Sequence, residues 1–386
     1  MLVKLLPILG ITFIDILGFS ILIPLMPYFV KHFGAPDIVV GGLFATFALC
    51  QFIGGPVWGN VSDRLGRKRV LIISQIGATI GWTMLAFAPN ISIVFLARII
   101  EGFSGGNISV TQAYVSDLVE PAKRGRAFAY IGAAFSSGLV FGPLAGGYLV
   151  GKYGYATPFL LAAGLQVLTL IVTIFVLPES RKKVEGERPA TLGDIRTSLL
   201  DRAIAPIMWQ KLVFSLGLYG WFSVFTLVLQ AQFGFDATNS SYFFCAFGLT
   251  SVIFQIGVVG RMTDALGDRV SSNIGFVVLL LAFAIVPFAH AIPLAIAMVV
   301  CFSLGLALVN ATIPALLSAN AADNMRGTVL GTASSLESIS GVFMPVIATL
   351  VLQTGGVAPT VAITFGLTAI ALVMGLAALR AAPSAA

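Results

Sequence analysis

Residues 59–69 read GNVSDRLGRKR, which places one acid and four bases between two long apolar stretches. The rest of the chain is poor in charge: of its 386 residues, 58% are hydrophobic and only 10% are charged. Soluble domains carry about 25% charged residues, whereas stretches of about 20 apolar residues suit helices that cross a bilayer core about 30 Å thick. Such helices satisfy their backbone hydrogen bonds internally, which open sheets cannot do in lipid. The sequence therefore predicts an all-α membrane protein.

Polar breaks before and after this loop predict twelve spanning helices. The expected spans are residues 5–30, 39–58, 70–88, 92–116, 127–150, 156–177, 206–232, 240–260, 272–290, 292–318, 328–352 and 356–379. The first exceeds the apolar core of a signal peptide, about 7–15 residues, and is interpreted as a retained helix. One long polar segment divides the spans six and six. We therefore expect an N-terminal bundle at 1–177, a cytoplasmic linker at 178–205 with a short surface helix near 192–201, and a C-terminal bundle at 206–386.

The basic residues predict the orientation of these spans. Of the 22 Lys and Arg residues, all but Lys31, Lys152 and Arg98 fall on one side when alternate loops are compared. Cytoplasmic loops are enriched in Lys and Arg, so both chain termini are expected in the cytoplasm. This distribution explains the net charge of +6 without a nucleic-acid partner, because no aromatic stacking pattern accompanies the bases.

The opening loop belongs to an internal repeat. Residues 59–69 align with GRMTDALGDRV at 260–270, and RGRAFAYIGAAFSSGLVFGP at 124–143 aligns with RGTVLGTASSLESISGVFMP at 326–345, at nearly the same offset. Six spans per repeat give the two halves the same orientation across the membrane. Parallel halves of this kind are a known transporter plan, with the substrate site at the midplane between them.

Four ordered motifs resemble the major facilitator superfamily, in its twelve-helix drug/proton antiporter branch. They are the loop at 59–69, DILGFSILIPLMP at 15–27, RIIEGFSGG at 98–106 and GLVFGPLAGG at 138–147. The nearest relatives in kind are tetracycline/proton antiporters. Their third span usually carries an acid where this chain has Gly81 and Trp82, which argues against tetracycline itself as the substrate.

The resemblance implies roles for two of these motifs. The loop at 59–69 is expected to act as a conformational latch, with Asp63 binding a positive helix N-terminus in the outward-facing state; the alternative is a loop that only sets topology. The latch residues are Gly59, Asp63, Arg64, Gly66 and Arg67. The antiporter motif comprises Gly138, Gly142, Pro143, Gly146 and Gly147. Three of its glycines recur every four residues, a spacing that lets helices pack closely.

Three acids are expected well inside the spans, namely Asp15, Glu101 and Glu337. Ionisable groups in the membrane are costly and are treated as functional by default. Arg98 lies three residues before Glu101 and therefore on the same helix face. By resemblance we expect Asp15 and Arg98 to form the proton-coupling pair, with Glu101 and Glu337 as proton-binding or cation-binding candidates. A static ion pair is the alternative for each.

A substrate cavity is expected to be mostly apolar with a few polar contacts. Its candidate lining residues are Trp82, Trp221, Phe225, Gln230 and Gln255. The resemblance predicts a proton-coupled antiporter that exports small lipophilic molecules from the bacterial inner membrane, acting as a monomer. A proton-coupled symporter or a facilitator for a nutrient such as a sugar is the alternative, and a transporter-like receptor or scaffold is a third class.

An enzyme is disfavoured. Residues 102–105 spell G-F-S-G, as in intramembrane serine proteases, but such a nucleophile needs a His base within hydrogen-bond reach. The only histidines, His32 and His290, are expected near outer span ends. The three cysteines show no metal-ligand spacing, so neither a metal nor a cofactor is predicted.

Overall fold

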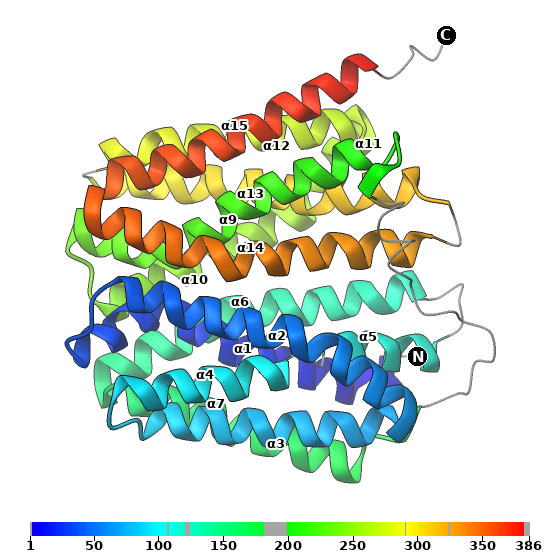
Figure 1. Cartoon of the computed structure of the whole chain (residues 1–386), viewed down its shortest axis with the longest axis vertical. Coiled ribbons are helices and arrows are strands. Elements are labelled where there is room, and N and C mark those ends of the chain that lie inside the picture. The colour runs from blue at the N-terminus through cyan, green and yellow to red at the C-terminus, as the bar shows by residue number, and fades with distance from the viewer. Residues whose placement is uncertain are drawn as a thin grey trace. The chain divides into compact units, whose positions relative to one another are not determined.

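A computed structural model describes residues 2–105, 108–119, 124–180, 199–289, 291–322 and 325–381. Within these ranges, twelve helical segments are long and apolar enough to cross a membrane. The prediction of an all-α protein with twelve spanning helices is therefore confirmed (Figure 1).

Contacts between residues divide the chain into two compact units, 1–186 with 235–245 and 187–234 with 246–386. The predicted boundaries at the 178–205 linker stay a prediction. The surface helix expected near 192–201 falls largely outside the described residues.

The first unit is built from helices in chain order. They are α1 (Leu2–His32), α2 (Ile38–Leu65), α3 (Arg67–Ala86), α4 (Ile91–Gly105), α5 (Ile108–Leu118), α6 (Arg124–Tyr153) and α7 (Ala156–Phe175). The start of α10 (Ala237–Phe254) also belongs to this unit. There the Tyr28 hydroxyl of α1 donates to the Phe235 carbonyl at 2.6 Å and lies 2.7 Å from the Ser240 hydroxyl. These contacts tie the first part of α10 to α1.

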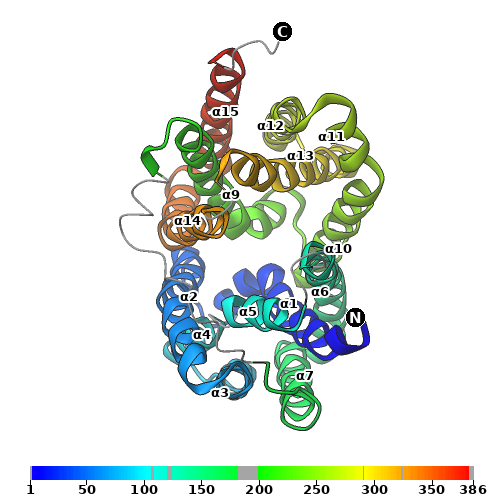
Figure 2. The ribbon, with the colours of Figure 1, turned by 90° about the vertical axis from the view of Figure 1, so that its right-hand side faces the viewer.

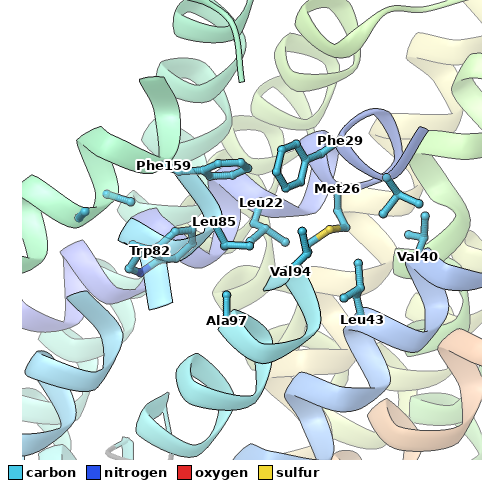
Figure 3. Close-up of a cluster of buried hydrophobic side chains, with 13 residues drawn as sticks. Leu22, Met26, Phe29, Val40, Leu43, Trp82, Leu85, Val94, Ala97 and Phe159 are labelled. Carbon is cyan, nitrogen blue, oxygen red and sulfur yellow. The ribbon is translucent and has the colours of Figure 1, made fainter. Parts of the chain in front are cut away.

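The core of the first unit shows why its helices are apolar on the faces that meet. One cluster joins side chains from α1, α2, α3, α4 and α7 (Figure 3). Its labelled members are Leu22, Met26, Phe29, Val40, Leu43, Trp82, Leu85, Val94, Ala97 and Phe159. Burying side chains of this size stabilises the packing by about 1.5–3 kcal/mol each in water-to-apolar terms. In lipid, close packing supplies more of the stabilisation, because lipid tails are as apolar as Leu.

The second unit contains the remaining helices. They are α9 (Ala205–Phe233), the rest of α10, the π-helix η2 (Gln255–Val259), α11 (Gly260–Leu266), α12 (Asp268–Ile285), the short 3-10 helix η3 (Val286–Phe288), α13 (Ile292–Asn320), α14 (Arg326–Gly355) and α15 (Val357–Ala381). Figures 1 and 2 both show α12 beside α13. These two helices approach so closely that a Cβ added at Gly305 would lie 2.7 Å from the Gly275 carbonyl oxygen.

The internal repeat has a structural counterpart in the loops that follow α2 and α11. Gly66 has φ 100° and ψ 151°, and Gly267 has φ 76° and ψ 162°. Side chains with a Cβ rarely adopt a positive φ, so glycine permits the same sharp turn into the next helix in both units. Because the two glycines occupy matching positions in the repeated segments, they give the repeat a common local geometry.

Candidate functional site

A buried ion pair lies inside the first unit on α4. Arg98 Nη1 donates to Glu101 Oε2, and the two side chains are only 1% and 4% exposed. The Arg98 guanidinium carbon lies 4.1 Å from the centroid of the Phe47 ring, so a cation–π contact adds to the pair. The other nitrogens of Arg98 and Glu101 Oε1 have no hydrogen-bond partner among the described residues. Buried polar atoms are normally satisfied, so this pair keeps unused hydrogen-bonding capacity.

The space for Glu101 comes from a glycine on α3. A Cβ added at Gly81 would overlap the side chain of Glu101. The resemblance described in the sequence analysis implies an acid in this part of α3, where Gly81 and Trp82 stand instead. The structure therefore places a carboxylate from α4 against the position in α3 that lacks one.

Asp15 lies half-buried on α1 and accepts a hydrogen bond from Gln166 Nε2 of α7 at 3.1 Å. Gln166 itself is almost fully buried. The contacts that the structure gives are thus Asp15 with Gln166 and Arg98 with Glu101. Coupling between Asp15 and Arg98 stays a prediction.

Two buried amides of the first unit were not anticipated from the sequence. Gln166 binds Asp15, and Gln75 on α3 is fully buried with neither side-chain amide atom hydrogen-bonded to a described residue. The available signal was the presence of Gln within an apolar span, since an uncharged amide in lipid also needs a partner.

A second intramembrane ion pair lies in the second unit. Glu337 of α14 accepts from Lys211 of α9, with Nζ and Oε1 2.5 Å apart. Lys211 falls within the predicted span 206–232, yet in the sequence it was counted only as a cytoplasmic topology signal. Its pairing with Glu337 was missed because the two residues are distant in sequence and meet only when α9 packs on α14.

The predicted latch residues gather at the junction of α2 and α3. Arg67 lies at the centre of this cluster of charged residues. Its side chain forms two ion pairs, with Nη1 2.6 Å from Asp63 Oδ1 and Nε 3.3 Å from Asp117 Oδ2. Its backbone N–H donates to Glu179 Oε1 at 2.8 Å. A Cβ at Gly66 would overlap the Glu179 carboxylate. Asp117 and Glu179 are therefore further members of this cluster that the motif alone did not identify.

The remaining latch residues, Gly59 and Arg64, lie in the last turns of α2. A Cβ at Gly59 would meet nothing within 4 Å, so close packing does not explain this glycine. The latch function stays a prediction for all five residues.

The antiporter motif lies in α6, where Pro143 is inside the helix. A Cβ at Gly138 would lie 2.9 Å from the α1 backbone, and one at Gly142 would overlap the Ser20 hydroxyl. Gly146 also faces α1, whereas a Cβ at Gly147 would lie 2.6 Å from the Ser241 side chain of α10. These glycines let α6 lie directly against its neighbours, while their role in antiport stays a prediction.

The candidate cavity residues occupy different environments. Trp82 belongs to the first unit's core, and Trp221 is 1% exposed among the rings of Phe225, Phe283 and Phe302. Packing accounts for these side chains in this structure, because rings that large are stabilised by burial against one another. Gln230 is partly buried and Gln255, in η2, is exposed. The substrate-lining role of all five residues stays a prediction.

The described residues include no group of three or more His, Cys, Asp or Glu side chains placed to hold a metal ion. His32 packs against Phe33 and Tyr155, and His290 lies outside the described residues. The absence of a cofactor stays a prediction.

Twelve spanning helices, a repeated loop geometry and charged pairs within the spans together define a polytopic membrane transporter. The chain belongs to the Major Facilitator Superfamily, whose sequence model matches residues 8–345 and, in a second match, 224–386.

Named relatives are similar over most of the chain. The class B tetracycline resistance protein of Escherichia coli is 28% identical over 349 residues, covering 88% of this chain and 86% of the relative. Multidrug resistance protein 2 of Bacillus subtilis (strain 168) shows the same identity and coverage. The crystal structure of the human organic anion transporter MFSD10 (TETRAN) matches with a TM-score of 0.73 and 22% identity, covering 96% of this chain and 98% of that one. This last likeness concerns the fold alone.

Family membership establishes several coarse properties. The protein is an integral membrane transporter for a small molecule, related to drug-efflux proteins, and it belongs to a family of transporters rather than enzymes. The expected resemblance to the tetracycline resistance group is confirmed, and the G-F-S-G protease alternative is excluded.

Proposed function

We propose that the chain is a proton-coupled antiporter that exports small, mostly lipophilic molecules by alternating access. The similarity to relatives named as tetracycline and multidrug resistance proteins supports export of toxic compounds. Those relatives are bacterial, which supports a location in the cytoplasmic membrane. The distribution of Lys and Arg supports cytoplasmic termini.

The observation that carries this proposal is the buried pair of Arg98 and Glu101. Charges within a bilayer mark proton or substrate pathways more often than structural sites. This pair keeps unpartnered atoms on both side chains, so a water molecule or a polar substrate group has hydrogen bonds to gain there. A fully satisfied static pair would offer no such capacity.

The chemistry follows from competition for one carboxylate. When Glu101 is ionised it is neutralised by Arg98; when it takes up a proton, Arg98 loses its counter-ion and must find another partner. Asp15, which accepts a hydrogen bond from Gln166, is a second carboxylate that can exchange a proton. Proton uptake by these carboxylates on one side of the membrane and substrate binding on the other side then exclude each other. Antiport requires this mutual exclusion.

The latch cluster supplies a means of coupling this exchange to conformation. Arg67 joins α2, α3, α5 and the segment after α7 through Asp63, Asp117 and Glu179. Because charge-assisted hydrogen bonds are among the stronger polar contacts, we expect them to stiffen this end of the first unit. Such stiffness suits rocking of helical bundles.

Everted membrane vesicles provide the test. Their lumen is acidified, a panel of toxic lipophilic compounds is added outside, and luminal pH is followed with a fluorescent amine dye. Wild-type protein is expected to release protons when a transported compound is added. Asp15→Asn and Glu101→Gln should reduce this release at least tenfold while compound binding stays measurable.

Asp37→Asn is the matched control, because Asp37 lies between the first two spans and pairs at 3.5 Å with Lys31 in the last turn of α1. It should exchange protons like the wild type. Undiminished release by Asp15→Asn rejects Asp15 as a coupling group. Movement of protons and compound in the same direction supports the symporter alternative and overturns antiport.

A further inference from the structure

Two glutamine side chains are buried inside the first unit. Gln75 of α3 is 0% exposed and Gln166 of α7 is 2% exposed. Gln166 Nε2 donates to Asp15 of α1, whereas both amide atoms of Gln75 lack a hydrogen-bond partner among the described residues. Leaving a buried polar group unsatisfied costs about 1–3 kcal/mol. Gln75 is therefore costly in the state that the structure shows.

Two contacts fix the register of α3 against α7. The rings of Trp82 and Phe159 lie with their centroids 6.3 Å apart (Figure 3). Toward the other end of the helix pair, Lys68 Nζ donates to the Ile174 carbonyl at 2.7 Å. The residue number falls on α3 as it rises on α7, so the two helices run antiparallel and pack over most of their length.

This register places the two glutamines at the same level. Gln75 lies seven residues before Trp82, and Gln166 lies seven residues after Phe159. Seven residues correspond to about 10 Å along a helix and return to within about 20° of the same face. Because the axes of packed helices lie about 8–10 Å apart, two glutamine side chains that face each other can span the distance.

The hydroxyls near these amides are engaged elsewhere. Thr169 donates to the Gln166 carbonyl at 2.8 Å, and Thr79 donates to the backbone carbonyl of Gln75 at 2.8 Å. A hydroxyl has a single hydrogen, so neither can donate to Gln75 Oε1 at the same time. The side-chain amide of Gln166 has two hydrogens, and it is the donor on α7 at the level of Gln75.

Asp15 has few ionisable neighbours on the helices that pack against α1, which are α2, α5, α6 and α7. On these four helices, Cys50 is the one ionisable side chain that lies more than two turns from a helix end, and it faces α4. Arg98 and Glu101, the other charges in the span interiors of the first unit, are paired with each other. A change in the protonation of Asp15 therefore acts directly on the amide of Gln166.

We propose that Gln166 and Gln75 form an amide relay that passes the protonation state of Asp15 from α1 to α3. The inference rests on the proposed proton exchange at Asp15 and names the residues that transmit it. An ionised carboxylate only accepts hydrogen bonds, so it holds the N–H of Gln166. A protonated carboxyl has an O–H that needs an acceptor, and the Gln166 side-chain oxygen supplies one when the amide turns over. The same turn directs the Gln166 NH₂ group to Gln75 Oε1, which gains the partner that it lacks.

The relay ends on the helix that makes room for the second carboxylate. Gly81 lies six residues after Gln75 on α3, and a Cβ at Gly81 would overlap the side chain of Glu101. A new hydrogen bond at Gln75 pulls α3 toward α7 and changes the space beside Glu101. Gln166 and Gln75 are thus positioning residues, because neither of them carries the proton.

The test measures proton release in everted vesicles beside compound binding and thermal unfolding in detergent. Gln75→Leu should slow proton release at least fivefold, while compound affinity stays within twofold of the wild type. Its Tm at neutral pH should not fall, because the amide that it removes is unpartnered. Gln75→Met is a second variant of the same kind, since Met is unbranched and fits irregular gaps, and it should behave in the same way.

Gln210→Leu is the matched control in the second unit. Gln210 is also buried, and its Nε2 donates to the Ala371 carbonyl at 2.9 Å. This variant should lower Tm and still release protons like the wild type. The two substitutions should therefore separate stability from coupling in opposite directions.

A double variant and a spectroscopic measurement identify the relay itself. Gln75→Leu combined with Gln166→Leu should release protons no more slowly than Gln166→Leu alone, whereas independent effects would multiply. Infrared difference spectra between acidic and neutral buffer record the acid C=O band of Asp15, which is identified by its loss in Asp15→Asn. This band should shift in Gln75→Leu, although Gln75 makes no hydrogen bond to Asp15 in the structure.

Four results would each overturn the relay: wild-type proton release by Gln75→Leu, a lower Tm of that variant, multiplied effects in the double variant, or an Asp15 band that Gln75→Leu leaves in place. The two measurements also separate the relay from the proposed function. Proton release by the wild type that Gln75→Leu does not slow rejects only the relay. An Asp15 band that shifts in Gln75→Leu, without compound-driven proton release by the wild type, supports the relay and rejects only antiport.

Discussion

The buried pair of Arg98 and Glu101 predicts an asymmetric response to mutation. Glu101→Leu leaves a guanidinium group that is 1% exposed, with the Phe47 ring as its remaining described partner. Removing one member of a buried pair costs about 3–5 kcal/mol, because the other charge stays in the interior uncompensated. Arg98→Met combined with Glu101→Leu removes both charges and both desolvation penalties. The double variant should therefore lie within about 1 kcal/mol of the wild type.

Thermal unfolding of the purified protein in detergent measures this difference through tryptophan fluorescence at a fixed scan rate. The entropy of unfolding grows by about 2.1 cal/mol/K per residue, so in a chain of 386 residues a change of 1 kcal/mol shifts Tm by about 1 °C. Glu101→Leu should therefore lower Tm by about 4–6 °C, and the double variant should recover most of the loss.

Asp37→Leu provides the comparison, because it breaks a pair with Lys31 that is much more exposed, at 27% and 41% for the two side chains. Exposed pairs contribute about 0–1 kcal/mol, so this variant should shift Tm only slightly. If Glu101→Leu is no more destabilising than Asp37→Leu, then the α4 pair is hydrated and the reasoning from burial is wrong.

Four further variants test packing and local conformation by the same thermal measurement. Gly142→Ala should lower the free energy of unfolding by about 1–3 kcal/mol, because the added methyl group meets α1. Its control is Gly132→Ala, where the methyl group meets nothing within 4 Å and the change should be neutral or stabilising by up to about 1 kcal/mol. Equal effects of the two substitutions would contradict the close approach of α6 to α1. Gly66→Ala should cost about 1–3 kcal/mol because φ is 100° there, and a neutral result would refute the need for glycine at this turn. Tyr28→Phe should cost about 1–3 kcal/mol, since the Phe235 carbonyl loses its donor, and an unchanged Tm would show that water replaces the hydroxyl.

Local pattern predicted the membrane helices well, for a physical reason. A span must be apolar along its whole length, so each of the twelve can be located without knowing its neighbours. The pairing of Arg98 with Glu101 was also accessible as a shared helix face, because residues three apart lie side by side on a helix. Likewise, Gly66 was singled out by its motif before its positive φ was observed.

Side-chain partners across helices were not accessible in this way. Hydrophobic packing of similar spans is degenerate in sequence, so nothing local indicates that Gln166 binds Asp15 or that Gly81 makes room for Glu101. For the same reason, the sequence did not show that Trp82 packs in the core of the first unit.

By itself, the sequence determined that this protein crosses a membrane with twelve helices, contains two related halves, and carries a few charges inside the bilayer. Hydropathy, loop charge and repeated motifs report these properties because each depends on residues close together in the chain. Only the tertiary structure decided which partners the other two acids have on neighbouring helices: Gln166 for Asp15, and Lys211 for Glu337. Partners on different helices meet through the rotation and close approach of packed helices, and these are properties of the assembled bundle rather than of any one span.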